Sequence, residues 1–316
     1  MLKGINNLRL GLGTAQLSNT DKSVKGVKHI SEIEVKSIIN DAVNKGIWFY
    51  DTGTHYGHTE TFLGELKRTY QDRVFIATKI GLGADGIRNF SKDNLNAQLD
   101  SSLRRLKTDK IDLLQLNKPS LEDIKRYQLF DYLKNLKEGK RIKYAGLVVG
   151  KEEDGFYAVE NKEGIIDALQ IFYNLIYFKS EDLLKIANEN KIFTIIRSPL
   201  NSGLLSGHYS FDQKFDKNDE RKNYFSGPLF KERLTAIKKI QKKLEIMDEE
   251  MVFYSLKFIL SNNNVDMVIP GASTVKQLNL YLAAARLKDK FKEDELSGIK
   301  NVISGYMSEI NHKLQN

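Results

Sequence analysis

Residues 74–117, VFIATKIGLGADGIRNFSKDNLNAQLDSSLRRLKTDKIDLLQLN, contain the pattern that decides the fold. Two short apolar runs, VFIATKI at 74–80 and IDLLQLN at 111–117, have the length and composition of buried strands. Between them, SKDNLNAQLDSSLRRLK at 91–107 places apolar residues at helical spacing. Because parallel neighbours need a long crossover connection, the stretch predicts two parallel strands joined by a helix.

The same alternation repeats along the chain. Further strand candidates are LRLGLGTA from 8, WFYDTG from 48, IKYAGLVVG from 142, DALQIFYNL from 167, IFTIIRSPL from 192 and DMVIPGAS from 266. Helix candidates lie between them, such as the segment from Ser31, where Ser31 and Glu34 form a capping box and Gly46 ends the helix. The pattern predicts an α/β fold, a single (β/α)8 TIM barrel over residues 1–316 with an added C-terminal helix from Glu293 to Asn316. The alternative is a doubly wound open sheet.

The composition limits the classes of function. Of the 316 residues, 41% are hydrophobic and 28% are charged, as in an ordinary globular enzyme, and the absence of Cys excludes disulfides and a cysteine nucleophile. The start lacks a signal-peptide pattern and no stretch is apolar enough to span a bilayer, so we expect a cytoplasmic protein with no membrane partner. Bases interleaved with acids make up the net charge of +8, which predicts a solvated face and no nucleic-acid partner, with the surplus attracting anionic substrates. The oligomeric state stays open.

Polar residues follow several strand candidates, where a barrel collects its reactive groups. Asp51 ends one strand, Tyr56 follows it, and Lys79 and Asn117 end the next two. A lysine ammonium beside a tyrosine lowers the pKa of the phenol from about 10 towards neutrality, and an aspartate keeps that lysine charged. A phenolic acid suits carbonyl reduction, in which the oxygen gains a proton as hydride reaches the carbon. On spacing alone, a strand-end cap, a packing residue and a solvated lysine remain open.

A resemblance to a known family favours the catalytic interpretation. The stretch GIWFYDTGTHYG at 46–57 resembles the signature of the aldo-keto reductases, with Gly53 where alanine is usual. The resemblance covers nearly the whole chain, and it implies that Asp51, Tyr56 and Lys79 are catalytic.

Further motifs resemble the cofactor-binding segments of that family. LGLGTAQ resembles the first strand of the family, and ALQIFYNL resembles a strand with a carboxamide-binding glutamine. RSPLNSGLLSG resembles the pyrophosphate loop, and VIPGASTVKQL resembles the adenosine site. The resemblance implies that NADPH is the cofactor, with NADH as the alternative. The implied cofactor-binding residues are Gly13, Thr14, Gln170, Arg197, Ser198, Pro199, Leu200, Ser202, Gly203, Gly271, Ser273, Thr274 and Gln277. FDKNDERKNYF at 215–225 resembles a loop that folds over the cofactor in several branches.

The chain also departs from the family pattern. LNKPS places Asn117 where histidine is usual, and an amide donates a hydrogen bond to a carbonyl but cannot shuttle a proton. The same exchange occurs in the potassium-channel beta subunits, a branch that reduces carbonyls slowly. Val148 and Val149 replace a Ser-Asn pair that holds the carboxamide. Arg197 replaces a nicotinamide-stacking aromatic residue, and a guanidinium either stacks or grips an acidic substrate. The adenosine motif offers Lys276 but lacks the usual arginine.

Two other motifs are weaker signals. GLGADG at 81–86 matches a dinucleotide-binding pattern, but IRNF separates it from Ser91, the expected cap of the next helix, so we interpret it as a βα loop. His55 and His58 have no well-placed third ligand, so we expect no metal site.

Three functional hypotheses follow. The first is an oxidoreductase that transfers hydride from NADPH to the carbonyl of an aldehyde, ketone or keto sugar, with Tyr56 as proton donor and a slow rate because of Asn117. The alternative is an NADPH-binding regulatory or partner protein with weak residual reductase activity. The third is a barrel lyase or isomerase that forms a Schiff base on Lys79.

Overall fold

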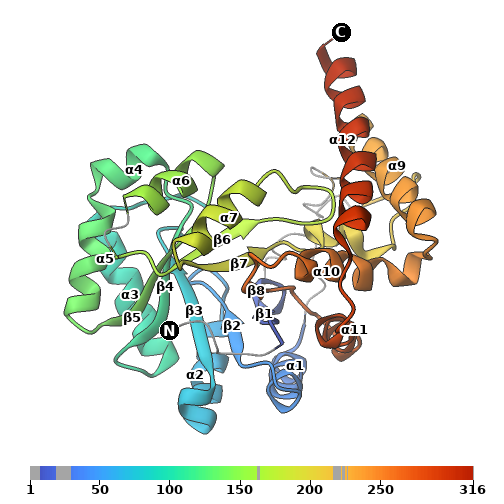
Figure 1. Ribbon diagram of the computed structural model, residues 1–316. Coiled ribbons are helices and arrows are strands. Elements are labelled where there is room, and N and C mark those ends of the chain that lie inside the picture. Colours follow the sequence, from blue (N-terminus) through green and yellow to red (C-terminus); the bar gives the residue numbers. More distant parts are fainter. Residues whose placement is uncertain are drawn as a thin grey trace.

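Eight parallel strands form one sheet in the computed structural model, which describes residues 8–18, 30–161, 164–215, 222, 225 and 227–315. The strands follow one another in chain order (Figure 1). They are β1 Leu12–Gly13, β2 Phe49–Asp51, β3 Phe75–Ile80, β4 Ile111–Asn117, β5 Ile142–Val148, β6 Ala168–Phe172, β7 Phe193–Arg197 and β8 Met267–Val268. Each coincides with a stretch that the sequence pattern predicts.

The first and last strands meet and close the sheet into a barrel. Leu10 pairs with Val268 and Gly13 with Gly271 in parallel bridges, and the Gly11 amide donates to the Val268 carbonyl at 2.8 Å. An open doubly wound sheet would leave two free edges, so this alternative is wrong. The predicted α/β barrel is confirmed.

Helices surround the barrel and connect its strands (Figure 1). The capping box of Ser31 and Glu34 is present, and Gly46 follows the end of that helix with φ +91°. The α-helices are α1 Glu32–Asn44, α2 Thr59–Tyr70, α3 Lys92–Leu106, α4 Leu121–Arg126, α5 Leu129–Glu138, α6 Glu152–Glu160, α7 Glu181–Glu189, α9 Gly227–Leu244, α10 Met251–Ser261, α11 Val275–Arg286 and α12 Glu293–Gln315. Short 3-10 helices are η1 Ala15–Leu17, η3 Gln71–Arg73, η4 Asn201–Ser206 and η5 Asp248–Glu250.

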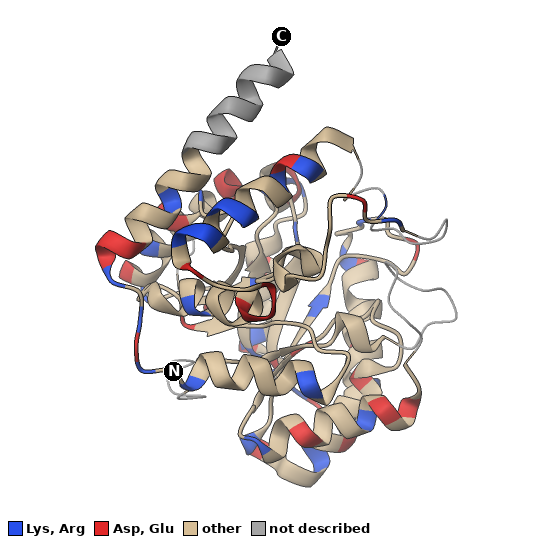
Figure 2. Ribbon diagram, turned by 90° about the vertical axis from the view of Figure 1, so that its right-hand side faces the viewer, with Lys and Arg blue, Asp and Glu red and all other residues tan. Residues whose placement is uncertain are grey.

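The added C-terminal helix, α12, is present as the sequence predicts, and it lies beside α9 (Figure 1). Ile299 and Ile303 of this helix are buried, and Lys300 Nζ donates to Glu181 Oε2 on α7 at 2.6 Å. Basic and acidic residues occur on the same helices of the face in Figure 2. In the part of the chain that the structure describes, no helix is both long and apolar enough to cross a membrane.

An apolar layer fills the barrel interior and ends where the polar site begins. It contains Phe49, Phe75, Leu113, Ala168 and Phe193 from five different strands. Because strand side chains alternate between faces, the residues two or four positions further along also point inward. These next positions bring polar side chains to the carboxyl end of the barrel, and they are Asp51, Lys79, Gln115, Asn117, Gln170 and Arg197.

Candidate active site

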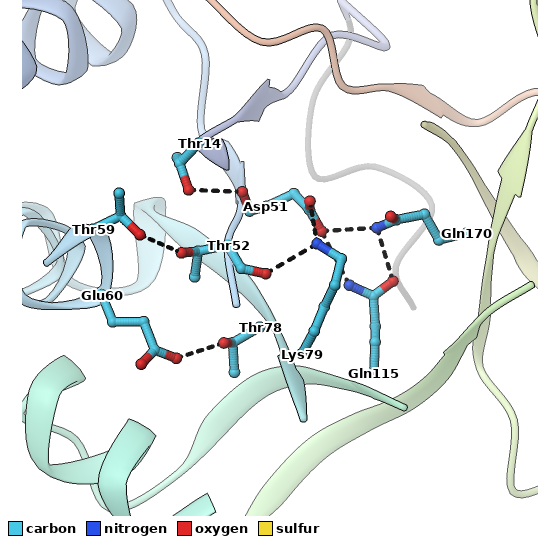
Figure 3. A network of polar contacts seen from close by, with 9 residues as sticks. All are labelled: Thr14, Asp51, Thr52, Thr59, Glu60, Thr78, Lys79, Gln115 and Gln170. Carbon is cyan, nitrogen blue, oxygen red and sulfur yellow. Dashed lines mark hydrogen bonds and ion pairs between the residues drawn. The ribbon is translucent and has the colours of Figure 1, made fainter. Parts of the chain in front are cut away.

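A buried ion pair stands at the centre of the candidate site (Figure 3). Asp51 ends β2 and Lys79 lies on the neighbouring strand β3, with 4% and 3% of their surfaces exposed. Lys79 Nζ donates to Asp51 Oδ2 and to the carbonyl of Thr52, the latter at 3.0 Å. The short strand β2 and its register with β3 therefore hold the ammonium in one place.

Two amides complete the surroundings of the carboxylate. Gln115 Nε2 donates to Asp51 Oδ1 at 3.1 Å and Gln170 Nε2 donates to the same oxygen at 2.8 Å. Gln170 also donates to Gln115 Oε1 at 3.1 Å. With Lys79 on one oxygen and two amides on the other, Asp51 has the partners that a buried carboxylate needs.

Gln115 is a residue of the site that the sequence analysis missed. It is fully buried on β4, opposite Lys79 in the strand register, and two residues before Asn117. The spacing of two was an available signal, because it puts Gln115 on the same face of the strand as Asn117. A glutamine within a run of leucines on that face requires a polar partner inside the barrel.

The charges favour an ammonium at Lys79. Burial lowers the pKa of Lys79, but the Asp51 carboxylate and the Tyr56 hydroxyl raise it more, so the pKa lies above its ordinary value. A lysine that forms a Schiff base needs the opposite shift, since the neutral amine is the nucleophile. The arrangement therefore disfavours the lyase or isomerase hypothesis.

Tyr56 lies beside this pair, in the turn between β2 and α2. Lys79 Nζ is 5.2 Å from the centroid of the Tyr56 ring. Burial raises the pKa of Tyr56, and the opposing influence of Lys79 through charge and hydrogen bonding does not overcome it. The expectation that Lys79 brings the phenol's pKa down towards neutrality is wrong in this structure, because desolvation of the phenolate is the larger effect. At neutral pH Tyr56 holds its proton, as a proton donor must.

Hydrogen bonds of Thr59 and Glu60, drawn in Figure 3, hold the start of α2, which follows the turn that contains Tyr56. The Thr59 and Thr52 hydroxyls lie 2.7 Å apart, and the Thr59 hydroxyl is also 3.1 Å from the Tyr56 carbonyl oxygen. Glu60, the next residue, has no exposed surface and accepts a hydrogen bond from Thr78 on β3 at 2.6 Å. These contacts tie the start of α2 to both strands of the ion pair and so position Tyr56.

Asn117 stands at the expected place, at the end of β4. It is 6% exposed and lies opposite Val148 in the register of β4 and β5. Among the described residues its side-chain amide has no hydrogen-bond partner, so the amide is available to a carbonyl oxygen. Val148 and Val149 are buried and apolar, and neither side chain is able to hold a carboxamide.

The first strand and the loop after β8 adjoin each other near the ion pair. The Thr14 amide and hydroxyl both donate to the Asp51 carbonyl, at 2.9 and 3.0 Å. A Cβ on Gly13 would lie 2.9 Å from the Ile269 carbonyl oxygen, so the close approach of β1 to β8 requires glycine there. Gly13 pairs with Gly271, which brings two predicted cofactor-binding residues together.

The segment after β7 contains several residues with positive φ. Ser198, Ser202 and Gly203 have φ of +52°, +55° and +93°, a region that non-glycine residues rarely adopt. The Gly203 amide donates to the Leu200 carbonyl at 2.9 Å, so this expected phosphate donor is engaged within the loop. Within the described ranges, the amides of Leu200 and Ser202 have no hydrogen-bond acceptor. Pro199 has no amide hydrogen to offer.

The predicted adenosine site lies at the N-terminus of α11. Thr274 caps the helix by accepting a hydrogen bond from the Gln277 amide at 3.2 Å. The amide and hydroxyl of Ser273 donate to Gln277 Oε1 at 2.8 and 3.1 Å. Donors gathered at a helix N-terminus suit an anion, which would take over the two hydrogen bonds that Ser273 gives to Gln277.

Three further motifs are the GLGADG stretch, the histidine pair and the loop FDKNDERKNYF. GLGADG leads into a loop and α3 begins only at Lys92, so the dinucleotide-binding interpretation has no structural support. His55 packs edge-on against Tyr56, with ring centroids 4.4 Å apart. The described residues contain no group of three or more His, Asp or Glu arranged to hold a metal ion. Of the loop FDKNDERKNYF, only residues 215, 222 and 225 lie within the described residues.

The chain is a closed α/β-barrel protein in which Asp51, Lys79 and Tyr56 lie together at the carboxyl end of the barrel. Residues 9–304 match the aldo/keto reductase family, and the chain belongs to this family. Oxidoreductases of this family act on small carbonyl compounds and generally use NAD(P)H.

Individual relatives agree with this membership. The chain is 30% identical over 282 residues to aldo-keto reductase str7 of Strobilurus tenacellus, covering 86% of this chain and 82% of the relative. It is 27% identical over 279 residues to aldo-keto reductase yakc [NADP(+)] of Schizosaccharomyces pombe, covering 82% and 79%. The fold is similar to that of a glycerol dehydrogenase from Gluconobacter oxydans, with a TM-score of 0.75, 21% identity and coverage of 94% and 92%.

Proposed function

We propose that this protein reduces the carbonyl group of an aldehyde, ketone or keto sugar with hydride from NADPH, and that Tyr56 donates the proton. The observation that carries the proposal is the buried Asp51–Lys79 pair beside the Tyr56 ring, at the carboxyl end of the barrel. An ammonium that is locked next to a phenol favours release of the phenol's proton to the substrate.

Each residue has a separate task in this proposal. Tyr56 gives its proton to the carbonyl oxygen, and the Lys79 ammonium stabilises the phenolate that remains. Asp51 holds Lys79 in position, and Gln115 and Gln170 hold Asp51. Asn117 donates its amide hydrogen to the carbonyl oxygen and so orients the carbonyl carbon towards the hydride donor.

The residues present fit a nicotinamide adenine dinucleotide phosphate. The amides of Leu200 and Ser202 and the positive φ values of their loop suit a pyrophosphate, and the donors at the start of α11 suit the 2′-phosphate. NADPH would supply the hydride that attacks the carbonyl carbon. The name of the Schizosaccharomyces pombe relative, which includes NADP(+), supports NADPH over NADH for this chain.

The test replaces the proton donor alone. In Tyr56→Phe we expect the single-turnover rate of NADPH oxidation with an aldehyde to fall at least about 100-fold, the usual range for a lost general acid. The NADPH dissociation constant, measured by nicotinamide fluorescence, should stay within about threefold. Tyr157→Phe, at a tyrosine packed against Phe130 on the helical layer, is the matched control and should retain full turnover. Full turnover in Tyr56→Phe would contradict the assignment.

Asn117 supports a second candidate function. An amide in place of histidine cannot relay a proton, which is the feature expected of an NADPH-binding regulatory or partner protein with weak residual reductase activity. The fluorescence titration distinguishes the two functions. Tight NADPH binding without turnover across a panel of aldehydes, ketones and keto sugars favours the regulatory protein, whereas turnover of one class favours the reductase.

A further inference from the structure

Arg197 is held rigidly at the carboxyl end of β7 by contacts that leave most of its donors free. Its register partner on β6 is Phe172, and the guanidinium carbon lies 5.0 Å from the centroid of the Phe172 ring. Nη2 donates to the Val149 carbonyl at 3.1 Å. A cation–π contact and one hydrogen bond therefore fix the orientation of a group that has five N–H donors.

The guanidinium has no anionic partner in the described part of the chain. Its Nε atom is buried and makes no hydrogen bond there, and no ion pair of Arg197 occurs among the described residues. Burial lowers the pKa of Arg197 to about 10, although Tyr56 and Tyr177 act against the shift. The side chain therefore remains charged at neutral pH in surroundings that do not solvate it fully.

Three other cations that are wholly or partly buried have partners among the described residues. Lys79 is paired with Asp51, and Arg105 is paired with the fully buried Glu60. Arg9 donates to three backbone carbonyls at the carboxyl-terminal side of α10. Because an uncompensated buried charge is costly, a cation that lacks such partners indicates a site for an external anion.

The position of Arg197 near Tyr56 indicates that the anion it would bind is part of the carbonyl substrate. Arg197 is close enough to Tyr56 for each to shift the other's pKa, and its side chain points into the barrel like Ile195 before it. Arg197 also interacts electrostatically with Tyr177, which is 37% exposed and packs edge-on against Phe172. The expected phosphate donors of the cofactor site are instead backbone amides of the following loop and of the start of α11.

We propose that Arg197 selects carbonyl substrates that carry an oxyanion, a carboxylate or a phosphate, on the same molecule. The proposal rests on the reductase function above and adds the substrate class. A planar guanidinium binds either oxyanion through two parallel hydrogen bonds, which an ammonium cannot reproduce. The Nε and Nη donors that remain free provide this bidentate geometry.

The kinetic test compares aldehydes that differ only in the anion. The pairs are 4-carboxybenzaldehyde with 4-methylbenzaldehyde, and glyceraldehyde 3-phosphate with glyceraldehyde; whichever pair shows the effect identifies the oxyanion. We expect Arg197→Met to lower kcat/KM at least about 100-fold for the anionic member, mainly through KM, and less than about threefold for the neutral member. Arg197→Lys should recover only part of the loss. Equal losses for both members of each pair, or a parallel weakening of NADPH binding, would overturn the proposal.

Lys151→Met provides the control for general electrostatic attraction. Lys151 lies shortly after β5, its side chain is 77% exposed, and it pairs with Glu153 at the surface. Removing its charge should change kcat/KM for the anionic aldehydes less than about threefold, because exposed charges are screened. A loss as large as that of Arg197→Met would contradict a specific role for Arg197.

A binding measurement separates this proposal from the proposed reductase activity. Titration calorimetry of the NADP+ complex with 4-(hydroxymethyl)benzoate and with 4-methylbenzyl alcohol needs no turnover. The carboxylate should bind at least about tenfold more tightly than the neutral alcohol, and Arg197→Met should abolish the difference. Equal binding of the two compounds refutes selection of a carboxylate even if aldehydes are reduced. Selective binding without turnover supports anion selection and refutes the reductase.

Discussion

Replacing Lys79 by Met would leave the Asp51 carboxylate buried without its cation, and the structure allows the cost to be bounded. Removing one partner of a buried ion pair costs about 3–5 kcal/mol. Asp51 would keep its hydrogen bonds from Gln115 and Gln170, and a hydrogen bond to a charged group contributes about 1.5–3 kcal/mol. We therefore expect the lower end of the range, a loss of about 3 kcal/mol in the free energy of unfolding at pH 8.

Equilibrium urea unfolding measures this loss, with the fluorescence of Trp48, the one tryptophan of the chain, as the probe. The double variant Asp51→Asn/Lys79→Met should recover part of it, since neither charge remains. Lys45→Met is the matched control: the pair of Lys45 with Asp41 is partly exposed, and its loss should stay below about 1 kcal/mol. A loss in Lys79→Met no larger than that of the control would refute the reasoning.

Two further predictions concern the same site. Burial raises the pKa of Tyr56 above its ordinary value of about 10, so the phenol stays protonated over a wider pH range. The single-turnover rate of carbonyl reduction should therefore be constant from pH 6 to about pH 9 and fall only above about pH 10. The rate of alcohol oxidation, which needs the phenolate, should increase with rising pH. A reduction rate that falls between pH 7 and pH 8 would contradict this assignment. Gln115→Leu removes a donor to the Asp51 carboxylate and should lower the free energy of unfolding by about 2 kcal/mol, with NADPH affinity unchanged in a fluorescence titration. A change below about 0.5 kcal/mol would show that the hydrogen bond contributes little to stability.

Particular residues show how far the sequence predicts the site. Asp51, Lys79 and Asn117 stand at predicted strand ends, which meet at one end of a barrel, but only the family resemblance favours a catalytic interpretation of Asp51 and Lys79. Gln115 was missed, since the strand containing it contains mostly leucines and only the pairing with β3 places it against Asp51. The predicted direction of the pKa shift of Tyr56 is also wrong, because the burial that raises this pKa depends on how the turn packs and not on the residues next to Tyr56 in the chain.

The sequence by itself determined the strand and helix alternation and the residue types at the carboxyl ends of the strands, because hydrophobic periodicity and capping are local properties of the chain. The tertiary structure decided whether the sheet closes, since that depends on hydrogen bonds between segments some 250 residues apart, such as Gly11 with Val268. It also decided which buried charges are compensated. Whether Arg197 has a partner cannot be deduced from its neighbours in sequence, because any such partner would come from another strand or loop of the barrel.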